Sequence, residues 1–206
     1  MSLHSVFSRG LNFSAFALLL SSAALAATPY NSVNLTLKQE LGNLSLSVNT
    51  KASPIMGVSK PTVKNGVAYI SASHSMGDWA IGLSPKLPLS LTLDRQQGDA
   101  ALDLRSLKLS ALSITQQLGD LTLNLPAATL QATLTQTQGD TTITLPSNVG
   151  LRLNVKKFTQ GTLIMSGKTV ADGFKFSGVY MTANYDSAAY KVNMTINKEQ
   201  GNLTVK

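Results

Sequence analysis

A glycine followed by aspartate recurs along this chain at nearly constant spacing, and this repeat limits the possible folds more than any other feature. Gly98-Asp99, Gly119-Asp120 and Gly139-Asp140 follow one another at intervals of 21 and 20 residues. Further members of the series are Gly42-Asn43, Gly77-Asp78, Gly161 and Gly201-Asn202. A fixed period of 20–50 residues indicates a repeat architecture, in which each unit packs mainly on its neighbours.

Counting from each glycine aligns the apolar residues in columns. The column four residues after the glycine contains Leu46, Ile81, Leu102, Leu123, Ile143, Met165 and Val205. Similar columns lie two and six residues after it and five before it. Polar residues such as Thr122 and Asn124 alternate with them, and residues two apart share one face of a strand. Each repeat therefore predicts two strands of about five to seven residues, whose apolar faces are buried when copies stack.

The turn residues agree with stacking. Glycine permits the left-handed backbone of a tight corner, and Asp or Asn after it tolerates turn geometry. Pro126 and Pro146 end their strands at equivalent positions, where a missing N–H does no harm. An antiparallel meander would not require matched columns, and a membrane barrel would have strands of about 10 residues with aromatic girdles. Aromatics are nearly absent from residues 80 to 157.

The sequence thus predicts an all-β, single-stranded β-solenoid of about eight turns with ~21-residue repeats and an aromatic-rich C-terminal end. That end carries an aromatic cluster within residues 158–190, comprising Phe158, Phe174, Phe176, Tyr180, Tyr185 and Tyr190. Two interpretations stay open for the cluster. It is either a cap that closes the stack or a patch that binds a ligand.

Residues 1–26 show the pattern of a secretory signal peptide. His4 and Arg9 lie in a weakly basic start, and Phe13 to Leu20 form an apolar run together with Ala23, Ala24 and Leu25. Ala24-Leu25-Ala26 forms a small-x-small cleavage motif. The run is shorter than the ~20 residues of a membrane-spanning helix. We therefore expect export, cleavage and no transmembrane segment afterwards. The β-solenoid domain of residues 27–206 would then be extracytoplasmic, in the periplasm, at the cell surface or secreted.

Charge and cysteine content narrow the partners. The chain has a net charge of +7, and Arg9 is the only charged residue of the expected leader, so +6 remains. A positive surface favours association with polyanions such as anionic envelope polymers. The basic residues are dispersed, with Lys156-Lys157 the only adjacent pair, and export argues against a nucleic-acid partner. The chain has no cysteine, which excludes disulfides and thiolate sites.

No residue is assigned a catalytic, cofactor-binding or metal-binding role. His74, with Ser73 or Ser75 and Asp78, supplies the residue types of a triad, but adjacency in sequence does not supply triad geometry. The repeated aspartates raise the question of calcium, yet the glycine-rich nonapeptide of calcium-binding β-rolls is absent. We interpret these aspartates as turn residues.

Two stretches carry a family resemblance. Residues 139–155 read Gly-Asp-Thr-Thr-Ile-Thr-Leu-Pro followed by a polar turn and a new strand, and residues 184–205 end in a similar pair of strands. This pattern resembles the toast-rack and putative-adhesin group of bacterial cell-envelope domains over residues 33–206. The resemblance implies a β-solenoid linked to envelope stress or adhesion. Such domains are often fused to membrane helices, which are lacking here.

The leading functional hypothesis is an exported, non-enzymatic β-solenoid that serves as an interaction or adhesion surface in the cell envelope. Its unidentified partner would be an anionic polymer or a protein. Two alternatives stay open: a carbohydrate-active enzyme on a parallel β-helix, which needs converging carboxylates, and a periplasmic carrier of an apolar ligand, which needs an unfilled core.

Overall fold

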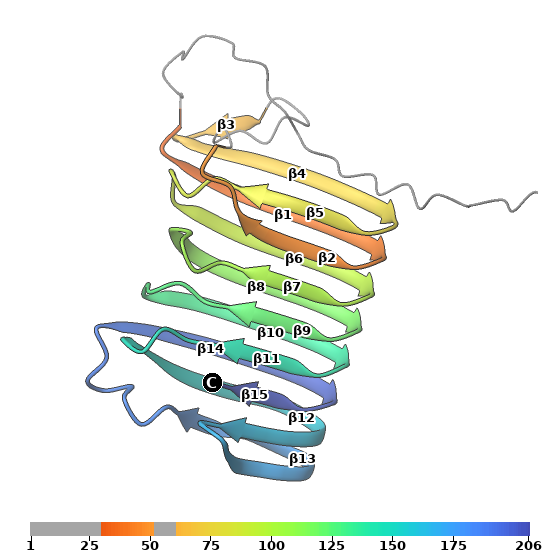
Figure 1. The fold of residues 1–206 in the computed structure, drawn as a ribbon, viewed down its shortest axis with the longest axis vertical. Helices are drawn as coiled ribbons and strands as arrows, with labels where there is room; N and C mark the ends of the chain where they lie inside the picture. Colours follow the sequence, from red (N-terminus) through yellow and green to blue (C-terminus); the bar gives the residue numbers. More distant parts are fainter. Residues whose placement is uncertain (1–29, 52–60) are drawn as a thin grey trace, which may run out of the picture.

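The computed structural model describes residues 30–51 and 61–206, so the expected signal peptide of residues 1–26 lies outside the described part (Figure 1). The described residues form strands and no helix. The fifteen strands are β1 (Ser32–Leu41), β2 (Leu44–Val48), β3 (Thr62–Lys64), β4 (Val67–Met76), β5 (Trp79–Leu83), β6 (Leu89–Gln97), β7 (Ala100–Asp103), β8 (Leu109–Leu118), β9 (Leu121–Asn124), β10 (Leu130–Gln138), β11 (Thr141–Thr144), β12 (Val149–Met165), β13 (Lys168–Met181), β14 (Tyr190–Gln200) and β15 (Leu203–Val205).

The molecule is a β-solenoid, which confirms the predicted fold class. A long strand leads into each corner glycine and a short strand leaves it, and we name such a pair a rung. β6 and β7, for example, meet at Gly98 and contain 9 and 4 residues. The prediction of two similar strands of five to seven residues is therefore wrong. The long strand extends up to the glycine because the residues just before the corner still pair with the neighbouring rung.

The long strands form one layer and the short strands another, and the two layers enclose the core (Figure 1). β12 passes through its corner without a break and therefore links the two layers into one sheet. Neighbouring rungs pair in parallel, in matched register. Two strands are antiparallel: β3 pairs with β4 at one end of the stack, and β13 pairs with β12 at the other.

The order of rungs in space differs from their order in the chain. The outermost rung is β4–β5, and the first rung, β1–β2, lies between it and β6–β7. At the other end the last rung, β14–β15, lies between β10–β11 and β12. Both ends of the solenoid are thus formed by hairpin segments from inside the sequence, and the strands nearest the described termini are flanked on both sides.

The predicted interior column is confirmed. Its members are at most 5% exposed, and their order in space is Ile81, Leu46, Leu102, Leu123, Ile143, Val205 and Met165. The column five residues before the glycine is buried in the same way, as Leu93, Ile114 and Leu134 show. Burial of these side chains contributes about 1.5–3 kcal/mol each, so the stacked columns account for much of the stability.

The corner glycines approach one another too closely for any other residue. Gly119 has a φ of 118°, and a Cβ built on it would lie 2.1 Å from the carbonyl oxygen of Gly98 in the next rung. The following Asp or Asn links the same rungs, because its Oδ1 accepts a backbone N–H from the neighbouring turn. The backbone N–H of Asp120 donates to Oδ1 of Asp99 at 2.9 Å, and the backbone N–H of Asp140 donates to Oδ1 of Asp120 at 2.8 Å. We name this row the Asx ladder.

A buried polar column lies three residues before the glycines and was not predicted. Gln116 and Gln136 donate side-chain N–H bonds to the carbonyls of Gly98 and Gly119 at 3.1 and 2.8 Å. In other rungs Gln39, Arg95 and Lys198 donate to a glycine carbonyl in the same way. The column therefore satisfies carbonyl groups that the tight corners withdraw from water, where an unpaired group costs about 1–3 kcal/mol.

Two members of that column, Arg95 and Lys198, are buried cations. Desolvation lowers the pKa of Arg95, and the nearby Asp99 opposes this effect. Desolvation also lowers the pKa of Lys198 to about 8, opposed by Asp140 and Asp120. The aspartates of the ladder therefore supply compensating charge for the two cations beneath them.

Candidate functional site

A row of hydroxyl side chains crosses the outer surface of the long-strand layer. In six consecutive rungs it lies six residues before the corner glycine. Its members, in matched register, are Ser71, Thr36, Thr92, Ser113, Thr133 and Thr195. We name this row the hydroxyl column. Rungs of a sheet are about 4.8 Å apart, so the column presents hydroxyl groups at regular intervals over several rungs.

These hydroxyl groups face outward and are available to a ligand. All six residues are partly or fully exposed. Among the described residues, the side-chain hydrogen bonds of hydroxyls involve other positions, such as Thr141 and Thr182. Two residues further along each strand, the outer surface adds residues of both charges, including Lys38 and Asp94. The surface is therefore flat, polar and rich in hydrogen-bonding groups.

The hydroxyl column ends at β12, where the regular pairing breaks. Asn154 of β12 lies opposite Thr195, and two residues later the register shifts. Lys156 has no counterpart in β14, and Lys156 and Lys157 together face the single residue Ser177 of β13. This is a β-bulge, which bends a strand and redirects its side chains.

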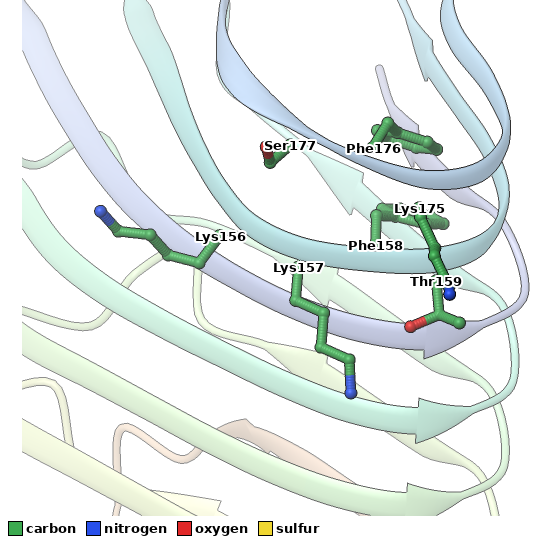
Figure 2. A pocket seen from close by; sticks show the side chains of 7 residues that line it. All are labelled: Lys156, Lys157, Phe158, Thr159, Lys175, Phe176 and Ser177. Atoms are coloured by element: carbon green, nitrogen blue, oxygen red, sulfur yellow. The ribbon is translucent and has the colours of Figure 1, made fainter.

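A hollow of about 460 Å³ opens at this bulge (Figure 2). We name it the lysine hollow. Its lining residues are Lys156, Lys157, Phe158, Thr159, Lys175, Phe176 and Ser177. Phe158 is fully buried and stacks on Phe176, with ring centroids 4.4 Å apart and planes 18° apart. The hollow thus has an aromatic wall and a cationic rim.

The positive charge of the lysine hollow is only partly neutralised. The Nζ of Lys157 lies 2.7 Å from a carboxylate oxygen of Glu199. Within residues 30–51 and 61–206, neither Lys156 nor Lys175 takes part in an ion pair. Two exposed ammonium groups therefore remain free to meet an anion. Lys156-Lys157 was the sequence signal for this site, but the pairing with β13 that brings Lys175 to it could not be read from spacing.

The other sequence candidates lie elsewhere. The ring of His74 stacks on Trp79 with centroids 5.4 Å apart, and Asp78 Oδ1 accepts the backbone N–H of Asn43 at 2.9 Å, which makes it part of the Asx ladder. No group of three or more metal-ligating side chains occurs in the described part of the chain. The repeated aspartates thus lie in the turns as expected, but their Oδ1 atoms accept from the neighbouring turn and do not cap their own.

The aromatic cluster divides between the two interpretations. Phe158, Phe176 and Tyr180 pack against the end of the core, as a cap would. Phe174 is 74% exposed on β13, so it does not contribute to the cap. Tyr185 hydrogen-bonds Asn193 at 2.8 Å and fixes the loop before β14.

No described helix is long and apolar enough to cross a membrane.

The fold and this outer surface define a parallel β-solenoid with a polar outer face. Residues 32–144 match the family model described as the N-terminal domain of toast_rack, DUF2154, and the chain belongs to this family. The expected resemblance is therefore confirmed. Comparison with curated proteins finds no match.

One solved structure shares the fold along most of the chain. It is described as a putative cell adhesion protein from Clostridium sporogenes ATCC 15579. The two are 17% identical, with a TM-score of 0.68, over 86% of this chain and 93% of that chain. At this identity the likeness establishes the common architecture.

Proposed function

We propose that this protein is an exported, non-enzymatic β-solenoid that serves as an adhesion surface in the cell envelope, with an anionic glycopolymer as its partner. The hydroxyl column carries the proposal. Six rungs hold hydroxyl groups in register on one exposed surface, and a polymer with its own repeating polar groups can form a row of equivalent hydrogen bonds to them. Individually weak contacts of this kind gain strength by multivalency.

Charge supports an anionic partner. The residues after the expected leader carry a net charge of +6, and Lys38 and Arg152 lie exposed on the same outer surface. Such a charge accelerates the encounter with a polyanion and makes binding sensitive to salt. The solved neighbour, whose description names cell adhesion, supports an adhesion-like role for this fold.

The enzymatic alternative has less support. The carboxylates that stacking brings close together belong to the Asx ladder, and Asp99, Asp120 and Asp140 each use Oδ1 as a structural acceptor. A glycoside hydrolase needs two carboxyl groups that flank a substrate, whereas the lining of the lysine hollow contains none. The carrier alternative needs space in the core, which the stacked leucine columns fill.

Cosedimentation tests the proposal. Purified protein without residues 1–26 is incubated at physiological salt with cell wall, extracted anionic glycopolymer and outer-membrane fractions. We expect it to pellet with the polymer-containing fractions and to be released as salt increases. Recovery of all protein in the supernatant of every fraction would contradict the proposal. Enrichment on a component that protease treatment destroys would contradict the polymer partner and identify a protein partner instead.

A further inference from the structure

Two backbone irregularities meet at the lysine hollow. One is the bulge at Lys156, and the other is Lys175, whose φ is 54°. Asn65 and Ser166 also have positive φ, but each precedes a glycine in a two-residue hairpin turn, where that conformation is favoured. Lys175 lies within a strand. Among the described non-glycine residues, it alone holds this strained conformation outside a hairpin turn.

The strain has a direct consequence for the site. Positive φ strains the backbone of a non-glycine residue, and such residues concentrate where a ligand is held. Bulges are likewise enriched beside functional sites, because they redirect a side chain. Here both features lie in facing strands, and the side chains of Lys156, Lys157 and Lys175 line one hollow (Figure 2).

The donor set favours one kind of anion. Each ammonium group is a compact charge with three rotatable donors, without the planar fork by which arginine binds a carboxylate. Thr159 and Ser177 add hydroxyl donors at the same hollow. Single-point donors on long side chains can each approach from a different direction, which suits the tetrahedral oxygens of a phosphate better than the two coplanar oxygens of a carboxylate.

The aromatic wall indicates what carries the phosphate. Phe176 stacks on the buried Phe158 and is itself only partly covered, so apolar surface remains beside the lysines. Ring faces bind the C–H surfaces of sugars and polyols while the polar groups point away. We propose that the lysine hollow is a binding site for a phosphate ester carried on a sugar or polyol. The site depends on its own residues and can bind this ligand even if the hydroxyl column binds nothing.

The test uses the protein without residues 1–26 and three probes of similar size. Glucose 6-phosphate presents the phosphate ester, glucuronate presents a carboxylate, and glucose presents neither. Binding is followed by amide chemical shifts in NMR titrations. We expect glucose 6-phosphate to shift Lys156, Lys175 and Ser177, glucuronate to bind about tenfold more weakly, and glucose to leave the spectrum unchanged.

A matched pair of variants separates the site from net charge. Lys156→Gln/Lys175→Gln removes the two unpaired lysines and leaves the Lys157–Glu199 pair intact. Lys64→Gln/Lys86→Gln removes the same charge from exposed positions outside the hollow. We expect the first variant to lose about tenfold or more in affinity for glucose 6-phosphate, and the second to bind as wild type does.

Three results would overturn the assignment: equal losses in both variants, undiminished binding by the first, or shifts confined to residues outside the hollow. A spectrum of the first variant with native dispersion shows that its loss is not due to unfolding. Vesicles of phosphatidylglycerol form a further arm. Vesicle binding that disappears in the first variant identifies a lipid headgroup as the source of the phosphate, and lack of vesicle binding assigns the site to a soluble or polymer-borne ester.

Discussion

The backbone N–H of Asp140 donates to Oδ1 of Asp120, one rung away, at 2.8 Å. The same bond recurs along the corner from Asp78 to Asn202, with Asn43 as one acceptor and aspartates as the others. A single side-chain oxygen therefore links each turn to the next. This explains why the repeat requires Asp or Asn after its glycine and does not require a charge at that position.

Substitution of Asp120 distinguishes the acceptor from the charge. Asp120→Ala leaves the N–H of Asp140 without its acceptor and is expected to lower the free energy of unfolding by about 1 kcal/mol. Asp120→Asn keeps Oδ1 and removes a negative charge that repels Asp99 and Asp140 but also compensates buried Lys198. These two charge effects oppose each other, so we expect a smaller loss than in Asp120→Ala. Urea unfolding measures both variants, and equal losses would contradict the role of the hydrogen bond.

The corner glycines give a second pair of variants. Gly119→Ala would place Cβ 2.1 Å from the carbonyl oxygen of Gly98, so neighbouring rungs must separate, and we expect a loss of roughly 3 kcal/mol or more. Gly167 also has a positive φ, of 75°, but a Cβ added by Gly167→Ala would have no atom within 4 Å. It should cost only about 1 kcal/mol, from backbone strain alone. Thermal unfolding compares the two, and similar losses would show that stacking does not constrain the corner.

Buried Lys198 predicts an unusual dependence of stability on pH. Its pKa is about 8 in the folded protein and 10.5 as the ordinary value. Between these values the unfolded chain binds a proton that the folded chain does not, so stability should rise with pH by a few kcal/mol at most. Lys198→Gln should remove this rise, because glutamine occupies the equivalent position of neighbouring rungs without titrating. Chemical denaturation at pH 7.5 and pH 10 measures the change in the free energy of unfolding. An equal rise in the variant would show that other groups are responsible.

The order of the rungs predicts a strong effect of a small truncation. β15 is the last strand in the chain, but it lies between β11 and β12, and Leu203 and Val205 are buried. Removing residues 203–206 exposes two strand edges and empties two core positions, so we expect a loss of at least 3 kcal/mol. Lys206→Gln is the control, because it changes only an exposed side chain and keeps the backbone hydrogen bonds to Ile143 and Leu145, and it should cost under 1 kcal/mol. If the longer truncation were equally mild, β15 would not be an interior strand.

The columns could be predicted because every rung repeats the same apolar positions, and the glycine marks the register. The order of the rungs could not. Gly42 and Gly77 are 35 residues apart, and Gly161 and Gly201 are 40 apart. These longer intervals signal an interruption, but the path of the hairpins that fill them is set by tertiary packing. The sequence of residues 54–64 fits none of the columns and predicts a loop or a distorted turn. Residues 54–60 lie outside the described residues, and the described remainder contains strand β3 at Thr62–Lys64.

The buried polar column was missed for a different reason. Gln116, Gln136 and Arg95 recur at one position of the repeat, but polar side chains beside a turn are usually solvated, and only the stack reveals that they are enclosed. The hydroxyl column recurs in the sequence six residues before the glycine, as Thr92, Ser113 and Thr133 show, but it was not predicted. Its register with neighbouring strands, and hence its continuity as a surface, appears only in the structure.

Polymer binding by two valine variants tests the central claim most directly. Thr92→Val/Thr133→Val/Thr195→Val removes three hydroxyls from the hydroxyl column with little change of shape or strand propensity. Thr122→Val/Thr142→Val/Thr204→Val makes the same change in a matched column on the short-strand layer. Affinity for the anionic glycopolymer is measured by calorimetry at physiological salt. If the hydroxyl column binds the polymer, the first variant loses about tenfold or more in affinity and the second binds as wild type does. Equal affinities in the two variants would contradict this role.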